Sequence, residues 1–293
     1  MVDREMICAG SFYPSLKSDC QRVINSLLEQ DTQAQTLENF EPKAAVVPHA
    51  GWEFCGDVTA AVFNALKQSK ISIDVFLLFG AVHLRGVLKP AVFDGAAWQT
   101  PIGIVDVNQQ LADLLVKNSS VFEKDSRCHK GEHSLEVVCP FIKHLYPDAE
   151  ICPVLVPPSE DAVQAGKDAA EAVKKIEDKN VFCIASSDLT HYGRRFDFSP
   201  AGEGEVGCKW AKEVNDKAFI EAAVSMDAKS VLSKGIYERS SCGPGAVAAA
   251  VEYARQVGSK EGKLLKHTHS FEVISSNYLC SSDSTVGYSG IIF

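Results

Sequence analysis

Short apolar runs alternate along the chain with longer segments in which apolar residues recur at helical spacing. Apolar runs of about four to eight residues are typical of buried strands, whereas spacings of three and four residues predict amphipathic helices. The runs that predict strands are 44–47, 73–80, 150–156, 180–188, 263–275 and 284–293. The segments that predict helices are 15–30, 56–68, 108–118, 132–145, 159–176, 203–224, 227–235 and 243–256.

Continuous apolar strands that alternate with helices favour one α/β architecture. We expect a central, mostly parallel or mixed sheet that is flanked by helices on both faces. No linker, repeat or low-complexity tract divides the sequence, so residues 1–293 are predicted to form a single domain. Two local features are also predicted: Asn108 caps the helix that follows it, and Pro140 kinks the helix over 132–145.

Composition and charge narrow the classes of partner. The net charge of −9 repels phosphate backbones, so we expect no nucleic-acid partner. No apolar run is long enough for a membrane span, and the first residues do not resemble a secretory signal. The ten cysteines have no paired spacing, which favours a reducing compartment over a disulfide scaffold or zinc finger. We therefore expect a cytoplasmic protein.

The candidate chemistry lies where predicted strands end. His49 follows the run 44–47, His83 follows the run 73–80, and Asp188 and His191 follow a third run. In open α/β sheets, ligands bind beyond the carboxyl ends of the strands, where distant segments meet. The sequence therefore predicts one pocket that gathers these side chains.

Each of these motifs has a structural alternative when it is taken alone. His49, in PHAG, could cap a strand–helix turn, and His83 could be a surface loop residue. Asp188 and His191 are three apart, so a helical turn would place them on one face, where the carboxylate orients the imidazole. The alternative is that Ser187 and its neighbours simply cap a helix.

A thiol and a second His pair complete the candidates. Cys242 precedes Gly-Pro-Gly and a predicted helix, whose dipole lowers the pKa of a thiol and favours a nucleophile or metal ligand. The alternative is a small residue packed at the helix start. His133 and Glu136, three apart on a predicted helix face, are expected to support the pocket rather than ligate directly. Three further histidines have no local partners in the sequence and are expected to be structural or exposed: His144, His267 and His269.

Taken together, these motifs resemble the MEMO family, called AmmeMemoRadiSam system protein B in bacteria and archaea. The resemblance runs in order through nearly the whole chain, and the set of motifs is specific although no single one is. The matching segments are AGSFYP (9–14), VVPHAGWEFCG (46–56), GAVHLRG (80–86), TPIG (100–103), GEHSLEVVCPF (131–141), CPVLVP (152–157), ASSDLTHYG (185–193), SSCGPGA (240–246) and STVGYSGI (284–291).

The resemblance implies a fold similar to the LigB-like class III extradiol dioxygenases and a transition metal (Fe, Cu or Zn) on His49, His83 and Cys242. His191 resembles the acid/base histidine of those dioxygenases, with Asp188 beside it. A thiolate in place of their carboxylate makes the site softer and an ordinary dioxygenase cycle doubtful. The loop GAVHLRG departs from the Gly-Pro-Ser-His of many relatives, which weakens the case for a second histidine proton relay there.

The first functional hypothesis is therefore a metal-dependent, dioxygenase-like redox enzyme of unknown substrate. The second is a module that binds a small molecule or a (phospho)peptide in the same pocket, with Arg194 and Arg195 at its rim. The family resemblance also implies radical SAM and AMMECR-type proteins as partners.

A third hypothesis is a thiol hydrolase. Cys242 would be the nucleophile, His191 the base, and the amides of Gly243 and Gly245 the oxyanion hole. Metal analysis of the protein and of a His49→Ala variant separates the three hypotheses.

Overall fold

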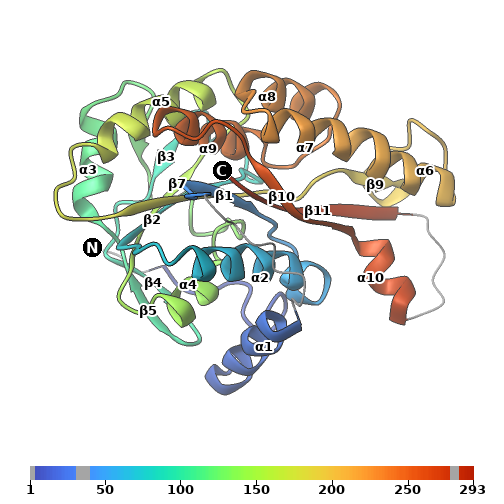
Figure 1. Cartoon of the computed structure of the whole chain (residues 1–293), viewed down its shortest axis with the longest axis horizontal. Coiled ribbons are helices and arrows are strands. Elements are labelled where there is room, and N and C mark those ends of the chain that lie inside the picture. Colours follow the sequence, from blue (N-terminus) through green and yellow to red (C-terminus); the bar gives the residue numbers. More distant parts are fainter. Residues whose placement is uncertain (1–3, 31–39, 278–283) are drawn as a thin grey trace.

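The middle layer of the protein is a mixed β-sheet (Figure 1). The computed structural model describes residues 4–30, 40–277 and 284–293. Within these residues the sheet has nine strands in the order β10-β11-β1-β8-β2-β7-β3-β6, with β9 paired to β11. The strands are β1 (Ala44–Val47), β2 (Val75–Gly80), β3 (Ala91–Val92), β6 (Glu123–Lys124), β7 (Glu150–Leu155), β8 (Val181–Ser186), β9 (His191–Gly193), β10 (Lys263–His269) and β11 (Ser284–Ile292). A separate hairpin joins β4 (Ala97–Thr100) to β5 (Gly103–Asp106).

The centre of the sheet is parallel, and an antiparallel pair bounds it on each side. Strands β1, β8, β2 and β7 pair in parallel, whereas β11 pairs antiparallel with β1 and β10, and β3 pairs antiparallel with β7. The last residues of three central strands stand in one row, because Ser186 is in register with both Val47 and Gly80. The predicted mixed α/β sheet is confirmed, and strands from both ends of the chain are neighbours within it.

Helices cover both faces of the sheet (Figure 1). Alternate residues of β2 face opposite ways: Val75, Leu77 and Phe79 belong to one core cluster, and Phe76 and Leu78 to the other. The first cluster packs beneath α3, α5, α7, α8 and α9, and the second beneath α1, α2 and α4. The helices are α1 (Lys17–Gln30), α2 (Trp52–Ser69), α3 (Gln109–Lys117), α4 (Cys139–Leu145), α5 (Asp161–Val173), α6 (Gly204–Trp210), α7 (Lys217–Val224), α8 (Ala228–Tyr237), α9 (Pro244–Gln256) and α10 (Ser270–Asn277).

Most predicted elements are found, and Asn108 caps α3 by accepting the N–H of Leu111 at 2.7 Å, as expected. The predicted helix over 132–145 is wrong in its first half, because residues 132–138 form turns and α4 begins only at Cys139. Pro140 therefore lies in the first turn and kinks nothing, since proline is well tolerated where its missing N–H would have no helical partner.

The predicted strand over 263–275 is also wrong in its second half. Strand β10 ends at His269, and the chain turns into α10. The Ser270 hydroxyl accepts the N–H of Val286 at 2.9 Å, where a continuing strand would have offered a backbone carbonyl. The region 203–224, expected to be helical, contains a π-helical turn at Ala211–Asp216 between α6 and α7. Among the described helices, none is long and apolar enough to cross a membrane.

Candidate metal centre

Three loops meet where the aligned central strands end. His49 lies two residues beyond β1, His83 three residues beyond β2, and Asp188 two residues beyond β8. Because β8 lies between β1 and β2 in the sheet, these loops emerge side by side. The ring centroids of His49 and His83 are 5.1 Å apart, so the structure brings together the two early histidines that the sequence singles out.

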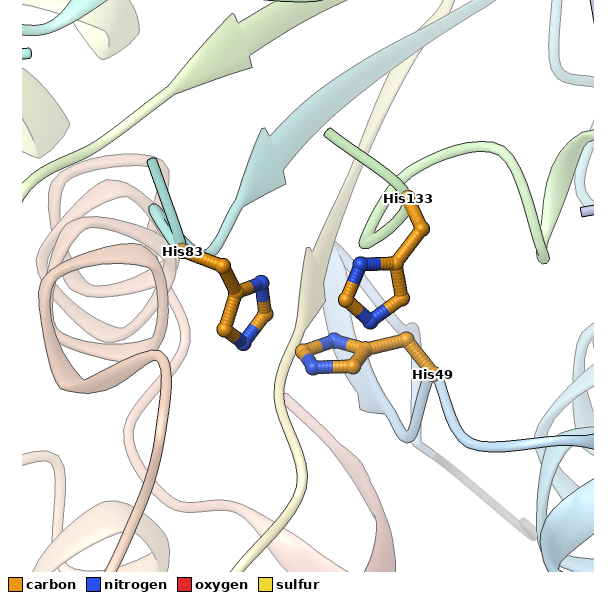
Figure 2. Close-up of side chains that lie close together, drawn as sticks. All are labelled: His49, His83 and His133. Carbon is orange, nitrogen blue, oxygen red and sulfur yellow. The ribbon is translucent and has the colours of Figure 1, made fainter. Parts of the chain in front are cut away.

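A third imidazole, from His133, joins this pair (Figure 2). Its ring centroid lies 5.3 Å from that of His49 and 4.6 Å from that of His83, and the rings turn toward a common centre. One ring nitrogen from each of the three histidines lies within 4.8 Å of the others. His133 was expected to support the pocket from a helix face, but the structure places it within the group itself.

His49 is the most enclosed member, and its hydrogen bonds fix its tautomer. Ser186 donates its hydroxyl proton to the carbonyl of Ser134 at 2.6 Å, so its oxygen accepts from His49 Nδ1 at 3.0 Å. Burial, together with the neighbouring His83 and His133, holds the pKa of His49 well below its usual value. The ring is therefore neutral, and its Nε2 carries a free lone pair.

Glu132 fixes the tautomer of His83, as Ser186 does for His49, and it was not among the residues that the sequence singled out. Its buried carboxylate accepts the His83 backbone N–H at 2.7 Å, His83 Nδ1 at 2.9 Å and the Ser134 N–H at 2.9 Å. Burial alone would raise the pKa of Glu132, but these hydrogen bonds lower it to about 2. Against its own burial, His83 has a raised pKa because of this carboxylate. The signal was present in GEHSL, where an acid directly precedes His133.

Cys242 contacts the group through His49. Its Sγ lies 3.2 Å from His49 Nε2, and His49, Asp188 and Cys242 form a second set of ligand-type atoms within 4.8 Å. Burial, and after it the Asp188 carboxylate, raises the pKa of the thiol. The expected lowering by the helix dipole is therefore wrong for the protein without a bound cation, because desolvation of the thiolate outweighs it.

Asp188 and His191 lie beside this second set. Asp188 Oδ1 accepts the His49 backbone N–H at 2.8 Å, and Asp188 Oδ2 lies 4.0 Å from His191 Nε2. Burial raises the pKa of Asp188 and lowers that of His191. Among the described residues, His191 Nε2 is buried without a hydrogen-bond partner. The segment makes no helical turn, since it is extended and His191 begins β9.

Ser187 and the glycines near Cys242 hold the chain rather than a ligand. The Ser187 hydroxyl donates to the Asp188 carbonyl at 2.7 Å and accepts the Gly243 N–H at 2.9 Å, so it caps no helix of its own. A Cβ on Gly243 would lie 2.9 Å from the Ser186 carbonyl, and one on Gly245 2.4 Å from the Pro157 carbonyl. The backbone itself makes the close approach that the Gly-Pro-Gly motif predicts.

Three further predicted pocket residues make contacts of their own. Glu136 is buried against Arg4 Nη1 at 2.8 Å and also accepts the hydroxyl of Tyr13 at 2.7 Å. Arg194 is exposed and binds the carboxylate of Glu203 at 2.7 and 2.8 Å. The guanidinium of Arg195 lies over the Phe196 ring at 5.8 Å.

Arg4 is a second residue that sequence reasoning missed. It is 2% exposed, pairs with Glu136, and donates Nε to the His129 carbonyl at 2.7 Å and Nη2 to the Glu132 carbonyl. Together Arg4 and Glu136 fix the turn segment that carries Glu132 and His133. No local pattern signals this role, because the contact spans more than a hundred residues.

Two histidines that were expected to be structural or exposed instead share a contact with one buried carboxylate. His267 and His269 both contact the buried carboxylate of Asp216. His144, by contrast, forms a surface hydrogen bond with Asn25 at 2.7 Å.

Comparison with known proteins links this centre to a family. A family model described as "Memo-like protein" matches residues 4–292, which include every side chain of the centre. A "MEMO1 family protein" of Thermococcus onnurineus is 32% identical over 97% of this chain and 97% of its own length. One of Nitrosopumilus maritimus is 29% identical over 99% of both chains. One of Thermoplasma volcanium is 32% identical over 99% of this chain and 97% of its own length.

Among solved structures, an uncharacterized protein from Escherichia coli K12 is similar with a TM-score of 0.49 and 12% identity. The similarity covers 86% of this chain and 100% of that chain. A likeness at this level identifies no function.

Proposed function

This chain belongs to the Memo-like protein family, and we propose that it is a metal-dependent, dioxygenase-like redox enzyme. The observation that carries the proposal is the set of imidazole nitrogens and one sulfur beyond the ends of β1 and β2 and before the start of α9. With Nδ1 of His49 held by Ser186 and Nδ1 of His83 held by Glu132, Nε2 of each ring is the atom left for a metal ion.

His49 is shared by two groups of ligand-type atoms, one with His83 and one with Cys242, and its contact with Cys242 has the spacing of two ligands of one transition metal. A sulfur about 2.3 Å and a nitrogen about 2.0–2.1 Å from one ion lie roughly 3.1–3.6 Å apart. Cys242 Sγ and His49 Nε2 are 3.2 Å apart, within that range. Imidazole and thiolate are ligands for Fe, Cu or Zn rather than Mg or Ca. His49, His83 and Cys242 would hold the ion, and a bound cation would offset the burial that keeps the thiol protonated.

His133 competes for the third or fourth ligand position. Its ring stacks on that of His83 with a 24° interplanar angle, and burial, followed by the charge of His83, lowers its pKa and keeps it neutral. His83 and His133 are each about a third exposed or less, so the centre opens to solvent on their side. A small substrate would reach it from there.

An iron or copper ion in this centre supplies one-electron redox chemistry. The proton chemistry would belong to His191 and Asp188. Since burial lowers the pKa of His191, its imidazole is neutral at neutral pH and one of its ring nitrogens can accept a proton. Asp188 lies 4.0 Å away and would stabilise the imidazolium that forms. Asp188 also anchors the backbone of His49, which ties the proton carrier to the ligand.

The alternatives have weaker support. The carboxylate of Glu203 already neutralises Arg194, so a phosphate would have to displace it. For a thiol hydrolase, His49 rather than His191 contacts the Cys242 sulfur. The Gly243 N–H is already donated to Ser187, and Gly245 packs on backbone, so neither provides the expected oxyanion hole.

Location and partners also remain proposals. No disulfide joins two of the nine described cysteines, which supports a cytoplasmic setting; Cys280 lies outside the described residues. Radical SAM and AMMECR-type partners are proposed from the family resemblance alone.

The test is redox titration of protein purified without oxygen. Wild-type protein is expected to retain about one equivalent of iron or copper at this centre. Its oxidation state should change reversibly, and the His49→Ala and His83→Ala variants should lose the metal. A His144→Ala variant, altered at a surface histidine, is the control. Full retention of the metal in both centre variants would refute the proposal. Loss of a redox-inert zinc would refute the redox part alone.

A further inference from the structure

A second cluster of ligand-type side chains lies at the other side of β11, outside the centre described above. Asp216, His267 and His269 each offer one ligand-type atom, and these atoms lie within 4.8 Å of one another. His267 Nε2 is 3.0 Å and His269 Nε2 2.7 Å from the same oxygen, Asp216 Oδ2. Both imidazoles thus aim at one point.

The local structure fixes all three side chains. Strand β10 places His267 and His269 on one face, because alternate residues of a strand point the same way. Asp216 is the last residue of the π-helical turn Ala211–Asp216, a kind of irregularity that occurs frequently at functional sites. Gly287 on β11 packs so closely that an added Cβ would lie 2.0 Å from Asp216 Oδ2.

The carboxylate is buried and has no cationic side chain beside it. Asp216 is 0% exposed, and among the described residues its partners are the Thr190 N–H at 3.0 Å and the two imidazoles, with no lysine or arginine. A buried carboxylate needs a compensating positive charge, from a proton on one imidazole or from a metal ion.

We propose that Asp216, His267 and His269 form a second metal site that takes a divalent ion of the zinc type. Oxygen and nitrogen ligands of one such ion lie about 3 Å apart, close to the observed separations. The supporting bonds are those typical of metal ligands: Asp216 Oδ1 accepts from Thr190, and His269 Nδ1 contacts Thr285 Oγ1 at 3.2 Å.

The surroundings of the cluster indicate how solvent would reach a bound ion and what the ion would do. The side chain of His267 is partly buried and lines a groove of about 540 Å³, together with Lys212, Leu264 and Ile220. A water molecule in this groove could supply a fourth ligand. The charge of Lys212 is already balanced by Glu272. Because Asp216 also holds the Thr190 N–H, an ion here would brace the segment between Asp188 and His191, and so act structurally on the first centre.

The test is zinc stoichiometry of protein stripped of metal and dialysed against zinc. The key variant is His267→Gln, whose amide can still donate to Asp216, and His144→Gln is the matched control at a surface histidine. Wild-type protein and the control are expected to hold two equivalents. His267→Gln should hold one, as should His49→Ala, and the double variant none.

The zinc stoichiometries distinguish failure of the first centre from failure of the second site. If the first centre binds no zinc, wild-type protein holds one equivalent that His267→Gln removes and His49→Ala leaves. If His267→Gln keeps as much zinc as wild type, the cluster is only a hydrogen-bonded triad and the proposal is overturned. X-ray absorption of the zinc in His49→Ala decides the matter even if His267→Gln fails to fold. Nitrogen and oxygen neighbours support the proposal, whereas a sulfur neighbour would overturn it.

Discussion

Replacing Glu132 by glutamine should weaken the metal centre without touching a ligand. The Glu132 carboxylate accepts three hydrogen bonds, two of them from His83. A glutamine of the same shape keeps one acceptor oxygen but points an N–H₂ donor at one of these N–H groups. In either orientation of the amide, one N–H group of His83 faces the N–H₂ group, so His83 loses part of the charged acceptor that holds its ring.

These contacts set the expected loss of metal affinity and of folding stability. Loss of a partner that orients a metal-ligating histidine typically weakens metal binding by about 10–100-fold, or roughly 1.4–2.7 kcal/mol. The fold should lose stability as well. A pKa lowered from the ordinary 4.5 to about 2 corresponds to up to about 3 kcal/mol. Since the folded pKa is the lower one, this contribution is fully present above about 4.5 and is lost as the pH falls through about 2.

Competition with a chromophoric chelator measures the affinity, and urea unfolding near neutral pH and in acid measures the stability. Glu123→Gln, the same change at an exposed strand residue, is the control and should alter neither. If folded Glu132→Gln binds metal as tightly as wild type, Glu132 does not position His83 for ligation. If its stability deficit grows rather than shrinks in acid, the sign of the pKa argument is wrong.

Three further changes test other contacts. Arg4→Met breaks a buried ion pair and should lower the free energy of unfolding by about 3–5 kcal/mol, whereas Arg22→Met, at an exposed pair, should cost no more than about 1 kcal/mol in the same urea experiment. Cys242→Ser should abolish sulfur-to-metal charge-transfer absorption in the cobalt-loaded protein; persistence of that band would place the sulfur elsewhere. Gly243→Ala should cost about 1–3 kcal/mol because its Cβ meets the neighbouring backbone, while Gly51→Ala, whose Cβ would lie 3.7 Å or more from its neighbours at a φ of −58°, should cost no more than about 1 kcal/mol as an N-cap change.

The sequence predicts the sheet well where strands are buried on both faces. The runs at 44–47 and 73–80 match β1 and β2 closely, because an uninterrupted apolar run has few other uses. The short strands β3 and β6 have two residues each and leave no periodic signal. The errors at 132–138 and 270–275 arise where hydrogen bonds from distant segments override local preference, as Ser270 shows with Val286.

The candidate site likewise contains residues that the sequence predicts and residues that only the fold brings into place. Strand ends are visible in the sequence, so the convergence of His49 and His83 could be predicted, and the coordinates place them together. The motif GEHSL marks Glu132 as a candidate but not its partner His83, and nothing local marks Arg4, because both roles depend on contacts across the fold. Asp216 with His267 and His269 likewise required the pairing of β10 with β11 beside a π-helical turn, which no local pattern predicts.

X-ray absorption at the edge of the metal retained after oxygen-free purification tests the central claim most directly. We predict that imidazole nitrogens and one sulfur surround the ion. The sulfur should be lost in Cys242→Ser, and the ion should be lost in His49→Ala. A protein without bound metal, or an ion surrounded only by oxygen, would contradict a metal centre built by His49, His83 and Cys242.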